Sequence, residues 1–169
     1  MPQRSPSQTV GPYYAIALPW KDGGRVTGVS GERIVLEGHV FDGNGQPVPD
    51  ALVETWQAPD RDAAPAKDGK PNGFGRVSAD ASGLFRIETA MPSGAAPCLD
   101  VTILARGLLK HLHTRVYFAD EARVRSEAAM APLASSPRLA TLIARKERAG
   151  HYHWDVRLQG EGETVFFAP

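Results

Sequence analysis

Histidine pairs with one residue between them are the feature of this sequence that most directly suggests metal chemistry. One pair is His111 and His113, and the other is His151 and His153. Because alternate residues of a β-strand point to the same face, either pair could present two imidazoles to one metal ion. Neither segment supplies the further ligands that a metal site needs. Histidines at strand edges that only form hydrogen bonds are therefore the favoured interpretation.

A single cysteine and one arginine are the next candidates. Cys98 starts an apolar segment after Pro97, which favours a buried structural thiol, because a reactive thiolate needs a nearby cation or a helix N-terminus. Arg106 follows the apolar run 101–105 and precedes Gly107. An arginine held at a strand end presents a planar set of donors that suits a carboxylate. That carboxylate could belong to a ligand or to one of the nineteen acidic residues of the chain, and the residues alone do not decide.

Aromatic residues at two places could line a ligand site. Trp56 and Gln57 end a predicted strand beside a polar loop, although an aromatic there more often belongs to the core. Tyr13 follows Gly11 and Pro12, of which the first permits close backbone approach and the second fixes φ. Tyr13 could therefore anchor the chain on a partner or form one wall of a ligand site. We find no serine nucleophile elbow, phosphate-binding glycine loop or zinc-protease motif, so no complete catalytic set is visible.

Length and composition indicate one globular domain. The 169 residues carry nineteen basic and nineteen acidic side chains, and the zero net charge argues against nucleic acid or an anionic membrane as a partner. One cysteine excludes an internal disulfide, and no apolar run is long enough to span a bilayer. The first ten residues lack the apolar stretch of a secretory signal. These features predict a soluble, cytoplasmic protein.

The elements that must position these residues are predicted to be mostly strands, because seventeen glycines and fourteen prolines separate short apolar segments. We predict an all-β fold, with an extended arm over 1–32 and a single β-sandwich domain over 33–169. One helix is predicted over 120–130, where two acids precede an alanine-rich segment and a proline follows. The predicted strands span residues 34–41, 51–57, 75–79, 84–89, 99–105, 113–118, 152–158 and 164–167.

Two details of that arrangement are sharper predictions. Residues 75–79 and 84–89, joined by a short turn with glycine, are predicted to form a hairpin. Along 152–158 apolar and polar residues alternate strictly, which places His153, Asp155 and Arg157 on one face of a strand. Arg157 and the strand residue Arg115 are predicted to form structural ion pairs. Residues 139–144 are ambiguous between helix and strand.

Four longer segments resemble the intradiol ring-cleaving dioxygenases. They are GHVFDGNGQPVPDALVETWQA at 38–58, GFGRVSADASGLFRIET at 73–89, ILARGLLKHLHTRVYFADEA at 103–122 and LQGEGETVFFAP at 158–169. The opening SPSQTVGPYY at 5–14 and the last two segments are most similar to the iron-free, α-type subunit of two-subunit members. The resemblance covers nearly the whole chain. It implies an antiparallel β-sandwich with an extended N-terminal arm and one short helix.

The resemblance also implies that this chain binds no catalytic iron. The family holds ferric iron with two tyrosines and two histidines. The tyrosine positions fall in 59–64 and 90–97, which contain no tyrosine, and the histidine positions fall at Cys98 and Asp100. His111 and His113 lie one strand too late to replace them. Fe(III) is accordingly expected in a partner β-type subunit, in a hetero-oligomer of αβ protomers.

A role in a shared substrate pocket follows from the same resemblance. The reaction implied is O2-dependent cleavage of protocatechuate to 3-carboxy-cis,cis-muconate, with no catalysis by this chain alone. Arg106 is expected near the substrate carboxylate, since an unpaired buried charge is costly. The residues expected to wall the pocket are Thr9, Gly11, Pro12 and Tyr13.

A non-catalytic binding module is the alternative, because residues 38–53 also resemble transthyretin-like sandwich domains. The HLHTR segment and the GEGETVFF tail favour the dioxygenase, since such modules have no reason to contain them. A third hypothesis is a decayed subunit that only stabilises its partner. The presence of Thr9, Gly11, Pro12, Tyr13 and Arg106 argues against it.

Overall fold

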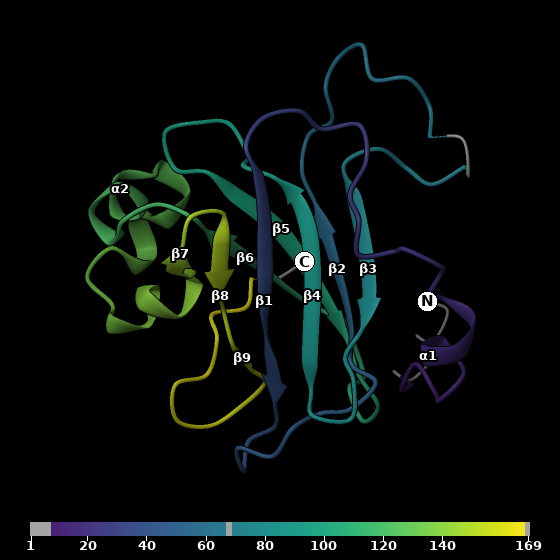
Figure 1. Ribbon diagram of the computed structural model, residues 1–169. Coiled ribbons are helices and arrows are strands. Elements are labelled where there is room, and N and C mark those ends of the chain that lie inside the picture. The colour runs from purple at the N-terminus through teal and green to yellow at the C-terminus, as the bar shows by residue number, and fades with distance from the viewer. Residues whose placement is uncertain (1–7, 67–68, 168–169) are drawn as a thin grey trace, which may run out of the picture.

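The computed structural model describes residues 8–66 and 69–167, which form two β-sheets packed face to face (Figure 1). The first sheet has the order β4-β1-β8-β7, and β9 also pairs with β1. Its strands are β1 (Arg33–Phe41), β4 (Leu84–Ala90), β7 (Arg145–Arg148), β8 (His151–His153) and β9 (Val156–Arg157). The second sheet has the order β3-β2-β5-β6, with β2 (Leu52–Trp56), β3 (Phe74–Ser78), β5 (Cys98–Leu104) and β6 (Leu112–Tyr117). The predicted β-sandwich is confirmed.

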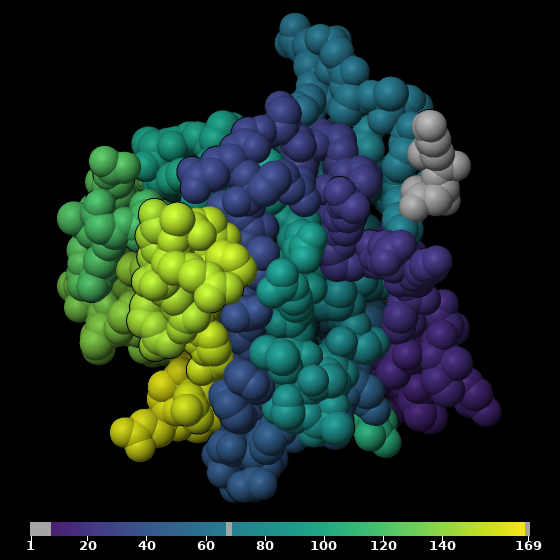
Figure 2. Space-filling view, viewed as in Figure 1, coloured from purple at the N-terminus to yellow at the C-terminus, as the bar shows by residue number. Residues whose placement is uncertain are grey.

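Alternating burial along the strands creates the core between the sheets. In β1, Ile34, Leu36 and Val40 are buried while the residues between them are partly exposed, apart from the buried Gly38. β5 shows the same period of two. Full burial of one such aliphatic side chain contributes about 1.5–3 kcal/mol, so the alternation dictates which face of each strand points inward. Figure 2 shows the opposite, outward face of the first sheet, with the β7–β8 segment in yellow-green at its side.

The predicted hairpin of 75–79 and 84–89 is wrong. β3 and β4 belong to different sheets, so the turn between them carries the chain from one layer to the other. β4 pairs instead with β1, in antiparallel register from Arg33 opposite Ala90 to His39 opposite Leu84. A short turn with glycine occurs in both kinds of connection, and only the packing of the layers distinguishes them.

Helical structure is more extensive than the single helix predicted. α2 (Glu121–Ser126) begins after Asp120, whose side chain accepts a hydrogen bond from the backbone N–H of Arg123 at 2.9 Å. The predicted helix over 120–130 breaks at Glu127, which is extended (ψ 126°). Two 3-10 helices follow, η1 (Ala128–Leu133) and η2 (Pro137–Leu142). They pack with α2 on a second apolar cluster that includes the buried residues Tyr117, Val124, Met130, Leu139 and Leu142. No helix among the described residues has the length and hydropathy to cross a membrane.

The N-terminal arm is not extended throughout. Residues 14–17 form one helical turn, α1 (Tyr14–Ala17). Further along, Val26 is buried in the main core, and the backbone of Arg25 forms an isolated parallel β-bridge with Glu88 of β4. The first seven residues of the predicted arm lie outside the described part of the chain. The boundary at residue 32 stays a prediction.

The C-terminal strands also differ from the prediction. The predicted strand over 152–158 is interrupted at Trp154 and Asp155 and becomes β8 and β9, both parallel to β1. The segment 164–167 adds only an isolated bridge between His113 and Phe167. The interruption lies against Gly38 of β1, where an added Cβ would stand 1.9 Å from the carbonyl oxygen of Trp154. A glycine at 38 is therefore required for this close approach.

Replacing Gly38 tests that requirement. We expect Gly38→Ala to lower the free energy of unfolding by about 1–3 kcal/mol, because the methyl group must displace backbone. Gly43→Ala is the matched control, since the three atoms nearest to its added Cβ all belong to the Gln159 side chain, the nearest at 3.3 Å, and none is backbone. Urea denaturation of both variants checks the difference. Equal stability of the two variants would contradict the close approach.

Candidate functional site

Asp50 links the N-terminal arm to the loop that follows β5. Its Oδ2 atom forms an ion pair with Nη2 of Arg106 at 2.8 Å. Its Oδ1 atom and its carbonyl oxygen each accept from the hydroxyl of Tyr14 at 3.0 Å. The sequence left open whether Arg106 pairs with a ligand carboxylate or with an acidic residue of this chain. Asp50 is such an acidic residue. The Arg106 side chain remains 59% exposed, so its other donors are available to a ligand.

Tyr14 is the buried anchor of the arm. It begins α1 and is only 4% exposed, whereas its neighbour Tyr13 is 77% exposed. Burial, with the hydrogen bond to Asp50 and the negative charge of Asp50, raises the pKa of Tyr14 to about 12. The neutral phenol is thus the form that holds the arm in place.

A second contact joins the arm to the loop after β5. The hydroxyl of Thr9 accepts from the backbone N–H of Gly107 at 3.3 Å. Gly107 and Gly11 both have positive φ, 88° and 76°, a conformation that favours glycine. The structure thus brings Thr9 beside Arg106, while Pro12 and Tyr13 continue the arm as exposed residues. The predicted site residues gather at one edge of the sandwich.

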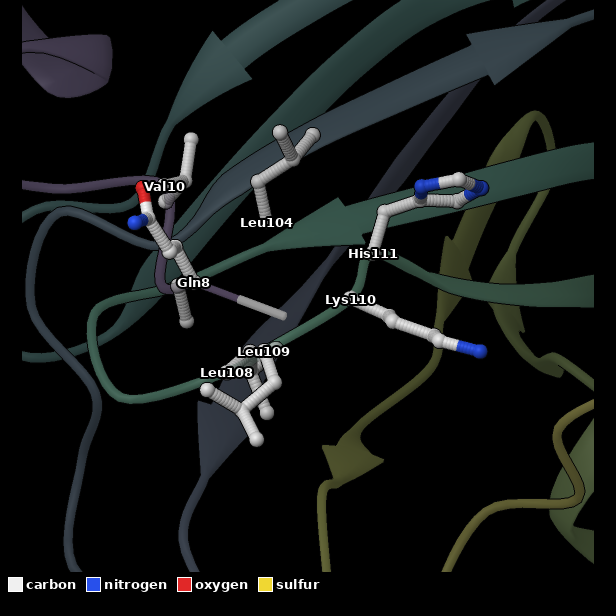
Figure 3. A pocket seen from close by; sticks show the side chains of 8 residues that line it. Gln8, Val10, Leu104, Leu108, Leu109, Lys110 and His111 are labelled. Carbon is white, nitrogen blue, oxygen red and sulfur yellow. The ribbon is translucent and has the colours of Figure 1, made fainter. Parts of the chain in front are cut away.

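An open groove of about 310 Å³ lies between the arm and this loop (Figure 3). Arg106 does not line it, because its guanidinium turns to Asp50. Figure 3 shows mainly apolar side chains around the groove, with the Lys110 amine pointing away. The lining residues are Gln8, Val10, Leu104, Ala105, Leu108, Leu109, Lys110 and His111.

Exposed large apolar side chains concentrate at the same edge. Among the described residues, all of them except Trp56 belong to the arm or to the loop after β5; they are Val10, Tyr13, Ile16 and Leu109. Apolar side chains gathered at one place on a surface are typical of interaction sites. This edge is therefore a candidate for contact with another protein.

The outward face of the second sheet holds other predicted residues. Arg115 donates from Nε to Oδ1 of Asp100 at 2.8 Å, which confirms it as a structural ion pair. His113 Nε2 lies 3.8 Å from the same oxygen, whereas His111 lines the groove, so this histidine pair does not converge. A shallow hollow on this face is bordered by Trp56, Asp100, His113 and Arg115. Burial raises the pKa of the Cys98 thiol, as expected for a structural cysteine.

The residues do not fit the iron site that the resemblance implies for the family. Tyr14 is bound to Asp50, and Tyr13 is exposed on the arm. Tyr117 is buried in the cluster beneath α2, and Tyr152 packs on Phe118. Within the described ranges, one group of potential metal ligands occurs, and it holds two histidines and an aspartate. A set of two tyrosines and two histidines is thus not assembled by these residues.

Sequence reasoning missed Asp50 and His39. Asp50 has a left-handed backbone (φ 58°) at the crossing between the sheets, and a Pro-Asp dipeptide before a strand was its only local signal. His39 occupies a partly exposed position of β1, which the alternation of 34–41 could have indicated. Their partners are distant in the sequence, so no local pattern identifies them.

Comparisons with known proteins agree with the resemblance. A family model described as "Dioxygenase" matches residues 11–101. The protocatechuate 3,4-dioxygenase alpha chain of Burkholderia cepacia is 38% identical, with 98% of this chain and 97% of that protein covered. The alpha chain of Pseudomonas putida is 36% identical, with 96% and 95% covered. The beta chain from Burkholderia cepacia is 44% identical, but over only 40% of this chain and 32% of its own length.

Solved structures support the fold. The dioxygenase domain of a dioxygenase–carbohydrate-binding fusion protein from Streptomyces sp. SirexAA-E has a TM-score of 0.58 at 23% identity, covering 94% of this chain and 99% of that one. Hydroxyquinol 1,2-dioxygenase from Pseudomonas putida DLL-E4 has a TM-score of 0.56 at 20% identity, covering 80% and 59%. The sandwich described above is thus the fold of ring-cleaving dioxygenases.

The anchoring of Tyr14 predicts a pH dependence. An unperturbed tyrosine ionises near pH 10, and Tyr14 when docked ionises near pH 12. The docking of Tyr14 on Asp50 is therefore fully favourable below pH 10 and weakens as the pH rises through 12. Between these two values only the released phenol ionises, which favours release. An ultraviolet titration of tyrosinate should show one late-titrating tyrosine fewer in Tyr14→Phe.

Tyr13→Phe is the matched control, since Tyr13 is its exposed neighbour. Burial also raises the pKa of Tyr117, so some late titration should persist in every variant. A Tyr14→Phe protein whose high-pH step matches that of the unmodified chain would contradict the docked position of Tyr14.

Proposed function

The chain belongs to the intradiol ring-cleaving dioxygenase family, and from this premise we propose that it is the iron-free α-type subunit of a protocatechuate 3,4-dioxygenase. The supporting observation is its similarity to two alpha chains over nearly their full length, against partial similarity to a beta chain. The transthyretin-like alternative has no comparable support.

The proposed reaction is the O2-dependent cleavage of protocatechuate to 3-carboxy-cis,cis-muconate. The bond between the two hydroxyl-bearing ring carbons breaks, and both atoms of O2 enter the product. Fe(III) is bound by the partner β subunit, and this chain completes the substrate pocket. It has no activity alone.

Arg106 is proposed to bind the carboxylate of protocatechuate. Its guanidinium presents five donors, the Asp50 ion pair engages Nη2, and the side chain is more than half exposed. A carboxylate paired with arginine in a closed pocket forms strong, charge-assisted hydrogen bonds. Asp50 acts as a positioning residue, because it limits the rotation of Arg106 about its long side chain.

The N-terminal arm is proposed to form both pocket wall and subunit interface. Thr9, Gly11, Pro12 and Tyr13 wall the pocket, starting from the contact between Thr9 and Gly107. The exposed apolar side chains of the arm and of Leu109 are covered by the β subunit, since burial of apolar surface drives association. The assembly is a hetero-oligomer of αβ protomers.

Iron content and protocatechuate-dependent O2 uptake test the proposal. Both are measured on the chain alone and after co-expression with a dioxygenase β subunit. We expect neither iron nor uptake in the chain alone, and both in the co-purified complex. Iron and turnover in the isolated chain would overturn the assignment of iron to the partner. Failure to form any complex would overturn the subunit role.

Substitution of Arg106 tests the substrate contact within that complex. We expect Arg106→Ala to raise KM for protocatechuate by roughly 10- to 100-fold, as for loss of hydrogen bonds to a charged group, without changing the iron content. Catechol lacks the carboxylate, so its KM should not change. The ratio of the KM for catechol to the KM for protocatechuate should therefore fall by the same factor. Steady-state O2 uptake with both substrates measures this ratio.

Arg145→Ala is the control for this variant. Arg145 is also exposed and ion-paired, with Glu147 at 3.0 Å, but it lies on β7 of the other sheet. The KM values of the Arg145→Ala complex for protocatechuate and catechol should not change. An Arg106→Ala enzyme with an unchanged KM, or with equal changes for both substrates, would exclude a contact with the carboxylate.

A further inference from the structure

Three potential metal ligands meet on the outward face of the first sheet. His39 lies on β1, His153 ends β8, and Asp155 lies in the interruption before β9. The parallel register pairs Glu37 with His153 and Val40 with Val156, so position 39 stands opposite position 155. His153 precedes Asp155 by two residues and shares its face. This is the face seen in Figure 2, on the sheet that does not contain β5.

The three side chains are close enough to share one ion. One potential ligand atom from each lies within 4.8 Å of the other two. His153 Nε2 is 2.9 Å and His39 Nδ1 is 3.5 Å from Oδ1 of Asp155. These separations suit three atoms around a central ion at about 2.0–2.2 Å from each.

The backbone holds this group in place. The N–H of His39 donates to Oδ1 of Asp155 at 2.9 Å, which ties the carboxylate to β1. Phe41 stacks on the His39 ring with 5.7 Å between centroids. The close approach at Gly38, described above, brings the two segments together. A ligand set that is already positioned loses little conformational entropy on binding.

Two imidazoles and one carboxylate define the class of ion. This donor set suits first-row transition metals such as Zn²⁺, whereas Mg²⁺ and Ca²⁺ prefer oxygen alone. The nearby carboxylate of Glu37 is paired with Arg86 at 3.1 Å. The side chains of His39, His153 and Asp155 are 33%, 21% and 38% exposed, which leaves room for water as a further ligand.

We propose that His39, His153 and Asp155 form a Zn²⁺-class site that joins the β8–β9 junction to β1. This site lies on the sheet that does not contain β5, the strand before Arg106, and it does not depend on the proposed function. An ion there links two segments far apart in the chain and binds only the folded state, so it stabilises the fold.

Zinc titration of the full chain, without a histidine tag and with any subunit that co-purifies, tests the proposal. Calorimetry with ZnCl2 should show one equivalent whose affinity falls about tenfold or more in His39→Gln and in His153→Gln. CoCl2 should give visible absorption bands that the same variants lose. Asp155→Asn should also weaken binding, while its amide oxygen can still accept from the His39 N–H.

His151→Gln is the matched control. His151 shares β8 with His153 and also faces outward, but it contacts Arg148. The His151→Gln variant should bind zinc as tightly as the unmodified chain does, and saturating zinc should raise the Tm of both proteins. Absence of binding to the unmodified chain, or an affinity unchanged in His39→Gln and His153→Gln, would overturn the proposal.

Discussion

The contacts of Asp50 are the interaction on which the arrangement of the candidate site depends. One carboxylate holds the phenol of Tyr14 and the guanidinium of Arg106, so two segments from different parts of the chain are fixed relative to each other. An exposed ion pair contributes little to stability, about 0–1 kcal/mol. The buried phenol gives the junction its strength, because a buried donor without its acceptor is costly.

That junction is placed at an edge of a rigid frame. The two sheets share one apolar core, and the loops that carry Asp50 and Arg106 leave it at adjacent strands, since β2 pairs with β5. A site built on such a frame keeps its geometry, whereas a site on loops alone does not. On the outward face of the first sheet, β1, β8 and the junction before β9 set the positions of His39, His153 and Asp155.

Local patterns in the sequence predicted most strands within one or two residues. β1, β2, β4, β5 and β6 lie where alternating or continuous apolar residues indicated them. The errors arose where the outcome depends on distant partners. The turn after β3 crosses between sheets, the helix breaks at Glu127, and the last predicted strand forms only a bridge. Propensity and period do not distinguish these outcomes, since both depend only on neighbouring residues.

The sequence by itself therefore determined most of the strands, the inward face of each of these, and some of the residues with chemical capacity, such as Arg106 and His153. Hydrophobic burial acts on every residue with a period that the chain itself contains, so this information is local. Only the tertiary structure decided which side chains meet. The pairing of Arg106 with Asp50, the docking of Tyr14, and the gathering of His39, His153 and Asp155 each require contacts between segments far apart in the chain. Such contacts follow from how the two layers pack, and no single segment encodes them.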